Sequence, residues 1–276
     1  MTQRATRVAF PGGAGAHSAA AAEALFPDAE LLGLPTFRAV ADEVMLGHVE
    51  FGVLPIESSV SGPVAETHDL LFDSALAAFA QTILPIRHLL VAPGPVALDE
   101  LRVIRSHPAA LEQCRRLLSG LPDAAVVAAA TTADAARIVS EEGDPTQAAI
   151  TSMRAVELFG LHVLEHDVGD HPEAFTRFFA IATYLRLEHE DDVSYRTSFS
   201  FVTDHRPGSL HSALEPFARL EVDLHQLVSR PIPHTPWRYR FDAVLAGHPL
   251  DDRVRQALGE AGARTRRLLV SGVYPE

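Results

Sequence analysis

The sequence contains no lysine, and all 23 of its basic residues are arginines. This absence excludes a Schiff-base lysine, a lysine general base and a Walker-type phosphate-binding lysine, and with them several classes of enzyme. The formal net charge of −13 argues against nucleic acids and anionic membranes as partners, because both require a concentrated basic surface. An anionic substrate must therefore meet positive charge that is local to its site.

Cysteine is almost absent as well, since Cys114 is the only one. A single cysteine allows neither an intramolecular disulfide nor a multi-cysteine zinc site, and it favours a reducing, cytoplasmic location. We expect Cys114 to be a small buried hydrophobe on a helix. No apolar run approaches the roughly 20 residues that span a bilayer, and the short run at residues 8–10 ends at Pro11, which indicates a first strand and not a signal peptide.

What the sequence does contain is a regular alternation of apolar strand-like runs and helical patterns. A chain of 276 residues, 47% of them hydrophobic, can form one large or two modest cores, and we expect two domains. The alternation from Thr6 to about Ala182 is typical of an α/β fold whose sheet neighbours are mostly parallel. The predicted strands cover residues 8–10, 29–34, 51–54, 103–105, 125–128 and 148–151. The predicted helices follow His17, follow a cap at Thr36, cover residues 108–118 and follow a cap at Thr131 or Thr132.

The composition changes after Tyr184. Residues 187–192 include four acidic residues and almost no apolar ones, which is typical of a solvated linker. Beyond it the predicted order is strand 197–203, helix 209–220, strands 224–229 and 239–245, helix 250–261 and strand 265–270. This βαββαβ order predicts a ferredoxin-like domain.

The most informative stretch runs from Gly52 to Val64, where a short apolar strand is followed by an acid, hydroxyl groups and glycine. The strand delivers Glu57, Ser58 and Ser59 to its carboxyl end, which is where α/β sheets usually bind ligands. A helix beginning near Pro63 would add backbone N–H groups that favour an anion. The stretch therefore predicts a site for a small carboxylate.

Several further segments accompany this stretch in an order that resembles the prephenate dehydratase family. They are Ser106-His107-Pro108, Gln113-Cys114, Ala148-Ala149-Ile150 with Ser152, Gly160-Leu161, Thr176-Arg177-Phe178, Pro207-Gly208 with Leu210, and Ser229-Arg230-Pro231. The resemblance covers nearly the whole chain. It implies a two-lobed, periplasmic-binding-protein-like α/β catalytic domain over residues 1–185, followed by a βαββαβ ferredoxin-like ACT domain over residues 194–272. Lobe one would comprise residues 1–76 and 165–185, and lobe two residues 77–164.

The reaction that the resemblance implies is loss of CO2 from C1 and of hydroxide from C4 of prephenate, which gives phenylpyruvate in L-phenylalanine biosynthesis. Aromatisation supplies the driving force, and neither a cofactor nor a metal is expected. The enzyme must supply a proton or a strong hydrogen bond to the departing hydroxyl, surroundings in which the ring carboxylate loses its charge, and closure against water.

The resemblance implies that Thr176 contacts the departing hydroxyl. A threonine hydroxyl is a poor acid, so we expect an oriented donor or relay and not a titrating general acid. Without the resemblance, Thr176 is a β-branched residue that opens a strand. Arg177 is expected either to pair with a substrate carboxylate or to brace Glu57 or Asp170, and Phe178 to contact the substrate.

The residues after Ile56 suit the second carboxylate of the substrate. Ser58 and Ser59 offer hydroxyls and neighbouring N–H groups, with simple helix capping as the alternative. Glu57 would lie beside an anionic substrate, so we expect it to orient a neighbour or to hold an arginine, with a buried structural ion pair as the alternative.

Other polar side chains stand where a strand turns into a helix. Ser106 is expected to contribute to catalysis and His107 to bind substrate, although a histidine at such a turn more often caps or packs. Thr132 either faces the cleft or caps its helix, and we favour the cap. His17 follows a glycine loop where family members usually carry an aromatic residue, and it is either a proton donor or an exposed loop histidine.

The pattern departs from the family at several cleft positions. Ser58 and Ala174 stand where asparagine is usual, Ala109 where glutamine is usual, and Thr131 where an acid is usual. Three lost amides leave fewer oriented hydrogen-bonding groups, which is expected to change the rate or the preferred ligand. The alternatives are therefore a non-aromatising prephenate decarboxylase or an arogenate dehydratase and, from another class, a non-catalytic sensor of amino acids or carboxylates.

The ACT domain that the resemblance implies brings two further expectations. Such domains usually pair side by side, so a homodimer or homotetramer is expected. Phenylalanine is the expected effector at the interface of the pair. Its predicted contacts are Gly208, Ser209, Leu210, Ser229, Arg230 and Pro231. Because His205, Ser209 and Val228 replace the usual asparagine, alanine and glutamate, the identity of the effector stays open, and the alternative is a dimer contact without a ligand.

Overall fold

The computed structural model describes residues 5–190, 192–232 and 235–276. The chain divides into two compact units, and each unit combines distant stretches of sequence. The first unit comprises the residues up to 64 and residues 82–178, and the second comprises residues 65–81 and 179–276. The chain passes from one unit to the other three times, after Val64, within β5 (Ala77–Pro85) and within β11 (Phe175–Ala182).

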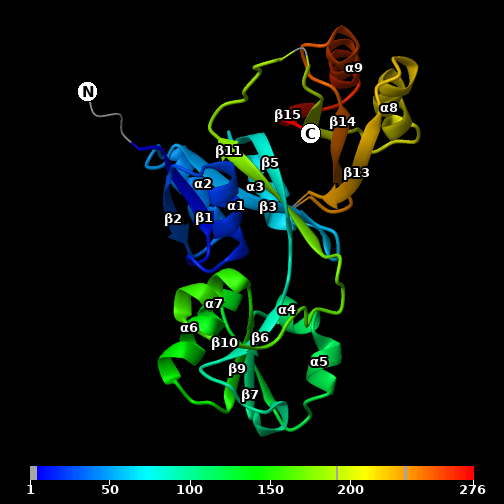
Figure 1. The fold of residues 1–276 in the computed structure, drawn as a ribbon. Helices are drawn as coiled ribbons and strands as arrows, with labels where there is room; N and C mark the ends of the chain where they lie inside the picture. Colours follow the sequence, from blue (N-terminus) through cyan, green and yellow to red (C-terminus); the bar gives the residue numbers. More distant parts are fainter. Residues whose placement is uncertain (1–4, 191, 233–234) are drawn as a thin grey trace. The chain divides into compact units, whose positions relative to one another are not determined.

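The first unit contains two sheets with helices beside them (Figure 1). Besides parts of β5 and β11, its elements are β1 (Arg7–Pro11), α1 (His17–Leu25), β2 (Glu30–Leu34), α2 (Phe37–Met45), β3 (Phe51–Ser58), β4 (Gly62–Pro63), β6 (Leu89–Ala92), the 3-10 helix η1 (Leu98–Glu100), β7 (Val103–Ser106), α4 (Pro108–Glu112), α5 (Arg115–Ser119), β8 (Ala125–Ala128), α6 (Thr132–Glu142), β9 (Gln147–Thr151), α7 (Met153–Phe159) and β10 (His162–Glu165).

One sheet of this unit is built around β1, which lies between β2 and β3 and runs parallel to both. The short strand β4 folds back antiparallel onto the end of β3, where Glu57 faces Pro63 and Ser58 faces Gly62. The helix predicted near Pro63 therefore begins two residues later, at Ala65. The carboxyl end of β3 is thus a tight hairpin that holds the predicted polar residues.

The other sheet has the order β10-β6-β9-β7-β8. As predicted, β7 runs parallel to β8 and β9, but β6 and β10 were not predicted, and β6 runs antiparallel to both of its neighbours. Alternate residues of β6 point to opposite faces. Leu89 and Val91 pack with α6 and α7, whereas Leu90 packs with Leu101 and Cys114.

Cys114 is buried, as predicted, and lies between two helices. Burial raises the pKa of its thiol to about 12, and the nearby Asp170 carboxylate adds to the shift. The thiol is therefore protonated and unreactive at neutral pH.

The prediction of a single helix over residues 108–118 was wrong, because α4 ends at Glu112 and α5 begins at Arg115. The reason is a distant aspartate. The N–H groups of Arg115 and Arg116 donate to the Asp170 carboxylate at 2.9 and 3.1 Å, and the Asp170 N–H donates to the Gln113 carbonyl at 2.6 Å. Burial acts to raise the pKa of Asp170, but these donors outweigh it and hold the pKa below its usual range. Asp170 therefore caps a second helix that the local sequence does not signal.

The second unit combines α3 with a βαββαβ segment. Besides parts of β5 and β11, its elements are α3 (Ala65–Asp73), β12 (Tyr195–Val202), α8 (Ser209–Arg219), β13 (Leu224–Pro231), β14 (Tyr239–Ala246), α9 (Asp252–Ala263) and β15 (Arg267–Pro275). The sheet order β13-β14-β12-β15, with every neighbour among these four antiparallel, is the predicted ferredoxin-like arrangement. Residues 187–190 of the predicted linker form neither helix nor strand, and residue 191 lies outside the described residues.

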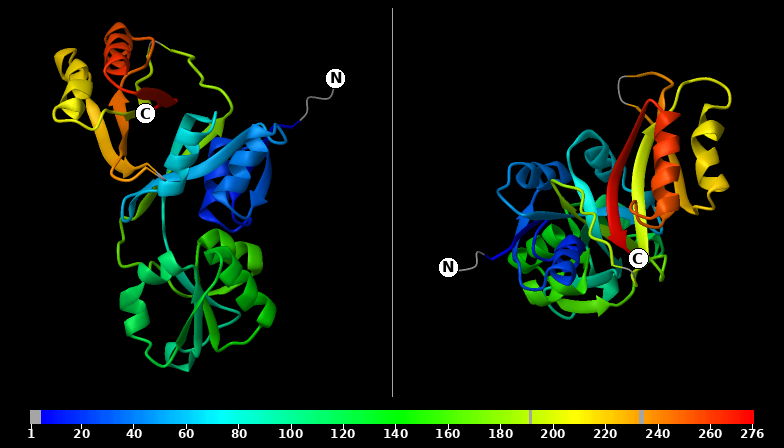
Figure 2. Two further views of the ribbon diagram at one scale, coloured as in Figure 1. Left: turned by 180° about the vertical axis from the view of Figure 1, so that it is seen from behind. Right: turned by 90° about the horizontal axis from the view of Figure 1, so that it is seen from above.

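One face of this sheet is covered by α8 and α9, which lie side by side (Figure 2). Phe199, Phe217 and Leu245 are among the buried residues of the core between the sheet and the helices. At its edge, β15 pairs parallel with β5 where Gly272 meets Ala78. A Cβ at Gly272 would lie 2.7 Å from that of Ala78, so only glycine allows this approach.

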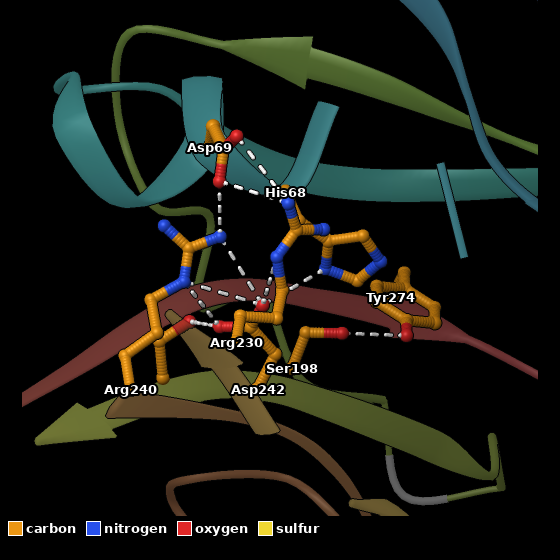
Figure 3. Close-up of polar contacts among 8 residues, drawn as sticks. His68, Asp69, Ser198, Arg230, Arg240, Asp242 and Tyr274 are labelled. Carbon is orange, nitrogen blue, oxygen red and sulfur yellow. Dashed lines mark hydrogen bonds and ion pairs between the residues drawn. The ribbon is translucent and has the colours of Figure 1, made fainter. Parts of the chain in front are cut away.

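The opposite face of the same sheet carries buried charges that meet α3 (Figure 3). Arg240 is 2% exposed, and it donates to Asp69 of α3 at 2.7 Å and to Asp242 at 3.1 Å. Arg230 lies 3.2 Å from Asp69, and His68 Nδ1 lies 3.6 Å from Asp242. Burial lowers the pKa of His68, so this histidine favours its neutral form. Two arginines and two aspartates then balance each other, as buried charges require.

None of the helices in the described ranges is both long and apolar enough to cross a membrane.

Candidate active site

The turn after β3 is closed by Ser58. Its Oγ accepts hydrogen bonds from the backbone N–H of Val60 at 3.2 Å and of Ser61 at 3.3 Å, and the Ser61 hydroxyl donates to it at 3.3 Å. This is the local turn-forming use of a serine side chain. Ser58 therefore fixes the shape of the hairpin between β3 and β4.

Ser59 joins this turn to the first residues of β11. The Ser59 N–H donates to the Phe175 carbonyl at 2.9 Å, and the Phe175 N–H donates to Ser59 Oγ at 2.9 Å. Ser59 Oγ also lies 3.5 Å from the Glu173 carbonyl, to which it donates. Thr176 is the next residue of β11 and is partly buried. The structure thus brings together the two motifs that carry the predicted serines and the predicted threonine.

Arg177 lies beside Glu57, with Nη1 3.8 Å from the carboxylate. Of the alternatives for Arg177, the structure shows the contact with Glu57, whereas Asp170 pairs with Arg116 at 3.3 Å. Within the described part of the chain, the buried Arg177 Nε has no hydrogen-bond partner. The guanidinium therefore keeps donor capacity while it is held by Glu57.

Ser106 and Phe178 are placed differently from the prediction that they contact substrate. Ser106 is fully buried, and its hydroxyl donates to the Ile150 carbonyl at 2.7 Å, which ties β7 to β9. Strand alternation is the reason, because Ser106 shares the inward face of β7 with Ile104. Phe178 is 2% exposed and lies in the hydrophobic interior. Neither side chain faces an open surface in this structure.

The helix starts show which polar residues are caps. His107 Nδ1 accepts the Ala109 N–H at 3.2 Å and caps α4, the alternative that the sequence left open. At α6 the cap is Thr131, which accepts the Asp134 N–H at 2.9 Å. The preference for Thr132 as a cap was wrong, because Thr132 is the first helical residue.

The glycine loop before α1 contacts the start of α7. Ser152 Oγ donates to the Gly15 carbonyl at 2.9 Å, and Arg154 Nε donates to the Ala14 carbonyl at 2.6 Å. A Cβ at Gly15 would lie 3.0 Å from that of Ala155, so the absence of a side chain allows the contact. These bonds hold the loop that precedes His17.

His17 is neither exposed nor in a loop, since it is the first residue of α1 and is partly buried. Its ring lies edge-on to that of His88, with 6.2 Å between the ring centres. Burial lowers the pKa of His17 to about 4, and the nearby His88 contributes. At neutral pH His17 is therefore uncharged, which disfavours an imidazolium proton donor.

A pocket of about 440 Å³ opens beside the turn after β3. It is lined by Val60, Ser61, Ala109, Glu112, Gln113, Arg115, Asp170 and His171. Its volume suits a small organic acid, and Ala109 is one of the positions where the family usually carries an amide. Sequence reasoning missed Gln113 as a site residue, although Gln113-Cys114 was part of the family pattern. Among the residues that the structure describes, no three His, Cys, Asp or Glu side chains are grouped so that they could hold a metal ion.

The predicted effector residues lie in the second unit, at one end of the ferredoxin-like sheet. Because β12 and β13 both run antiparallel to β14, the turn after β12 and the end of β13 share that end. Gly208 adopts φ +81° as the cap of α8, and Leu210 packs against the core. Ser229 and Pro231 are exposed, whereas Arg230 belongs to the ion-pair network with Asp69. The remaining predicted contact, Ser209, is partly buried at the start of α8.

The two sheets and the order of elements define a two-lobed α/β protein with a C-terminal βαββαβ segment. The model of the prephenate dehydratase family matches residues 8–184, and the chain belongs to this family. Arogenate dehydratase/prephenate dehydratase 1 of Arabidopsis thaliana is 32% identical over 283 residues, which cover 98% of this chain and 72% of that protein. The predicted family and fold class are confirmed.

Two solved structures extend the similarity over almost the whole chain. Prephenate dehydratase from Arthrobacter aurescens, in complex with L-Phe, has a TM-score of 0.88 at 29% identity, and the match covers 98% of this chain and 90% of that one. GqqA, described as a novel type of quorum quenching acylase, has a TM-score of 0.86 at 29% identity, and the match covers 98% of this chain and 97% of that one.

Proposed function

We propose that this protein is a prephenate dehydratase, a carbon–oxygen lyase of L-phenylalanine biosynthesis. The prephenate dianion takes up one proton and yields phenylpyruvate, CO2 and water, with no cofactor. The observation that carries the proposal is the set of hydrogen bonds between Ser59 and Phe175, because they bring Thr176 to the polar turn after β3 in a chain of this family.

Each site residue has a proposed role. Thr176 donates a hydrogen bond to the departing C4 hydroxyl. Arg177, held by Glu57, directs its remaining N–H groups to one substrate carboxylate, and the turn at Ser58 and Ser59 receives the other. His17, His107 and Thr132 supply further polar contacts from helix starts. Ser106 and Phe178 support the site from the interior, because both are buried.

We also propose that residues 1–185 form the catalytic domain, with lobe one at residues 1–76 and 165–185, and that residues 194–272 form an ACT regulatory domain. The ferredoxin-like sheet supports this assignment, and so does the relative from Arthrobacter aurescens that was solved with L-Phe. Regulation by phenylalanine, a homo-oligomeric assembly and a cytoplasmic location belong to the same proposal. Millimolar phenylalanine is expected to change the activity or to raise the melting temperature, and no change in either contradicts effector binding.

Incubation of the purified chain with prephenate tests the activity. Phenylpyruvate absorbance together with CO2 release supports the dehydratase. CO2 without an aromatic product indicates a non-aromatising decarboxylase, and thermal stabilisation without turnover indicates a sensor. A parallel incubation with arogenate, the aminated analogue, compares kcat/KM for the two substrates, since the relative from Arabidopsis thaliana is named for both.

A further inference from the structure

His88 is a buried histidine that does not line the pocket itself but contacts Gln113, which does. It lies between β5 and β6 and is 5% exposed. Its Nε2 lies 2.9 Å from Gln113 Oε1, and Gln113 lines the pocket. The backbone of both residues is fixed as well, because the His88 carbonyl accepts the Val168 N–H at 2.9 Å and the Gln113 carbonyl accepts the Asp170 N–H.

The hydrogen-bonding pattern favours one tautomer of His88. Burial lowers its pKa, although the bond to Gln113 acts in the opposite direction, so the ring is neutral at pH 7. Among the described residues, His88 Nδ1 is buried and has no hydrogen-bond partner. A buried bare lone pair costs less than a buried N–H without an acceptor, so the proton resides on Nε2. The ring then donates to Gln113 Oε1, and the amide N–H groups of Gln113 are turned away from His88.

No other described residue that lines the pocket could replace the amide of Gln113. The chain contains no asparagine, and Gln113 is the one amide side chain among the described residues that line the pocket. Ala109, where the family usually carries glutamine, lines the same pocket without a polar group. An oriented carboxamide at residue 113 therefore matters more in this chain than in one with several amides.

We propose that His88 is a positioning residue that, by donating from Nε2 to Gln113 Oε1, presents the N–H groups of Gln113 to an oxygen of the bound substrate. This proposal rests on the proposed function, because it assumes that the pocket beside the turn after β3 holds part of a prephenate-like acid. Gln113 makes the substrate contact, and His88 acts only through it.

A double-mutant cycle with the full chain tests the proposal. We expect His88→Leu to lower kcat/KM for prephenate about tenfold to hundredfold, and Gln113→Leu to lower it at least as much. The double variant is expected to match Gln113→Leu within about threefold, because His88 acts through Gln113. His88→Gln retains a donor of similar reach and is expected to recover most of the activity. His162→Leu, an exposed position in the same unit, is the matched control and is expected to match the wild type.

Losses that multiply in the double variant, or a His88→Gln variant as slow as His88→Leu, overturn the proposal, because both results indicate a structural role for His88. The melting temperature of each variant separates unfolding from loss of the contact.

A second readout is independent of turnover. In the full chain labelled with 15N-histidine, we expect the His88 resonances at pH 7 to show a protonated Nε2 and a bare Nδ1. We also expect Gln113→Leu to shift the resonance of the Nε2 proton, because that variant lacks the acceptor of its hydrogen bond. A proton on Nδ1, or a cationic ring, overturns the proposal. If the wild-type chain turns over neither prephenate nor arogenate, the proposed function fails, and the tautomer of His88 still decides whether His88 orients Gln113.

Discussion

Two clusters of buried polar groups in this protein are built in opposite ways. In the second unit, Arg240 and Asp242 are nearly inaccessible, and with Arg230 and Asp69 they form a set of ion pairs in which charge balances charge. In the first unit, His17, His88 and Gln113 form a neutral group, because burial lowers the pKa of both histidines.

The difference separates buried polar residues that stabilise the fold from buried polar residues that serve a binding site. The charged groups of the second unit pair with one another, and these ion pairs attach α3 to the sheet (Figure 3). The neutral cluster adjoins a pocket through Gln113 and keeps hydrogen-bonding capacity for a ligand. Mutations in the charged cluster are expected to lower the stability of the protein. Mutations in the neutral cluster are expected to change its activity and the pH dependence of its stability.

The largest effect is expected from Asp242→Ala. This change leaves Arg240, which is 2% exposed, and Arg230 with Asp69 as their one shared carboxylate in the cluster, so the cluster carries an excess positive charge. An uncompensated buried charge costs about 3–5 kcal/mol, so the free energy of unfolding measured with urea should fall by that amount. The control is Arg253→Gln, which removes an exposed pair with Glu221 and should change stability by less than about 0.5 kcal/mol. Equal effects of the two changes contradict the account of the charged cluster.

His17 should make stability depend on pH. Its pKa is lowered from 6.5 to about 4 in the folded chain, so between these values the unfolded chain binds a proton that the folded chain does not. Stability is therefore fully present above about pH 6.5 and falls as the pH decreases toward 4, by about 1–3 kcal/mol. His17→Phe should flatten this part of the profile of unfolding free energy against pH, whereas His162→Phe should not. If His17→Phe leaves the dependence of unfolding free energy on pH unchanged, His17 is not held neutral by the fold.

A smaller loss is expected from Arg230→Met. Arg230 is more exposed than Arg240, Arg240 still contacts both aspartates when Arg230 is replaced, and the excess negative charge is shared with Asp69, which is 43% exposed and therefore solvated. We expect a decrease of about 1 kcal/mol in the free energy of unfolding, measured as for Asp242→Ala. Because Arg230 is also a predicted effector contact, the response of the melting temperature to phenylalanine should be recorded for the same variant. Wild-type stability together with a lost response would assign Arg230 to the effector and not to the network.

Local patterns were sufficient to predict much of the fold. The apolar runs at β1, β3, β7 and β8 and the βαββαβ order after residue 194 were predicted from sequence. In contrast, β5 has no clean alternation, and β6 follows only three residues after it, so neither was found. The break between α4 and α5 depends on Asp170, which is 55 residues from Arg115 in sequence and therefore gives no local signal.

The site shows the same limit of local reasoning. The motifs identified the turn after β3 and the start of β11, and the structure brings both together through Ser59. The pairing of His88 with Gln113 joins residues 25 apart, and the burial of Ser106 follows from the face of β7 that packs inward. Arg240 and Asp242 alternate with Phe241 and Ala243 along β14, but the sequence alone does not show that α3 covers the charged face.

The central claim is that two distant segments place a threonine hydroxyl where prephenate loses its C4 oxygen. The most direct measurement compares phenylpyruvate formation from prephenate by the wild type, Thr176→Ala and Thr176→Ser, with the melting temperature of each chain. We predict that Thr176→Ala lowers kcat about 10²–10³-fold without unfolding the protein, and that Thr176→Ser retains most of the rate. A folded Thr176→Ala variant with wild-type kcat would contradict the claim.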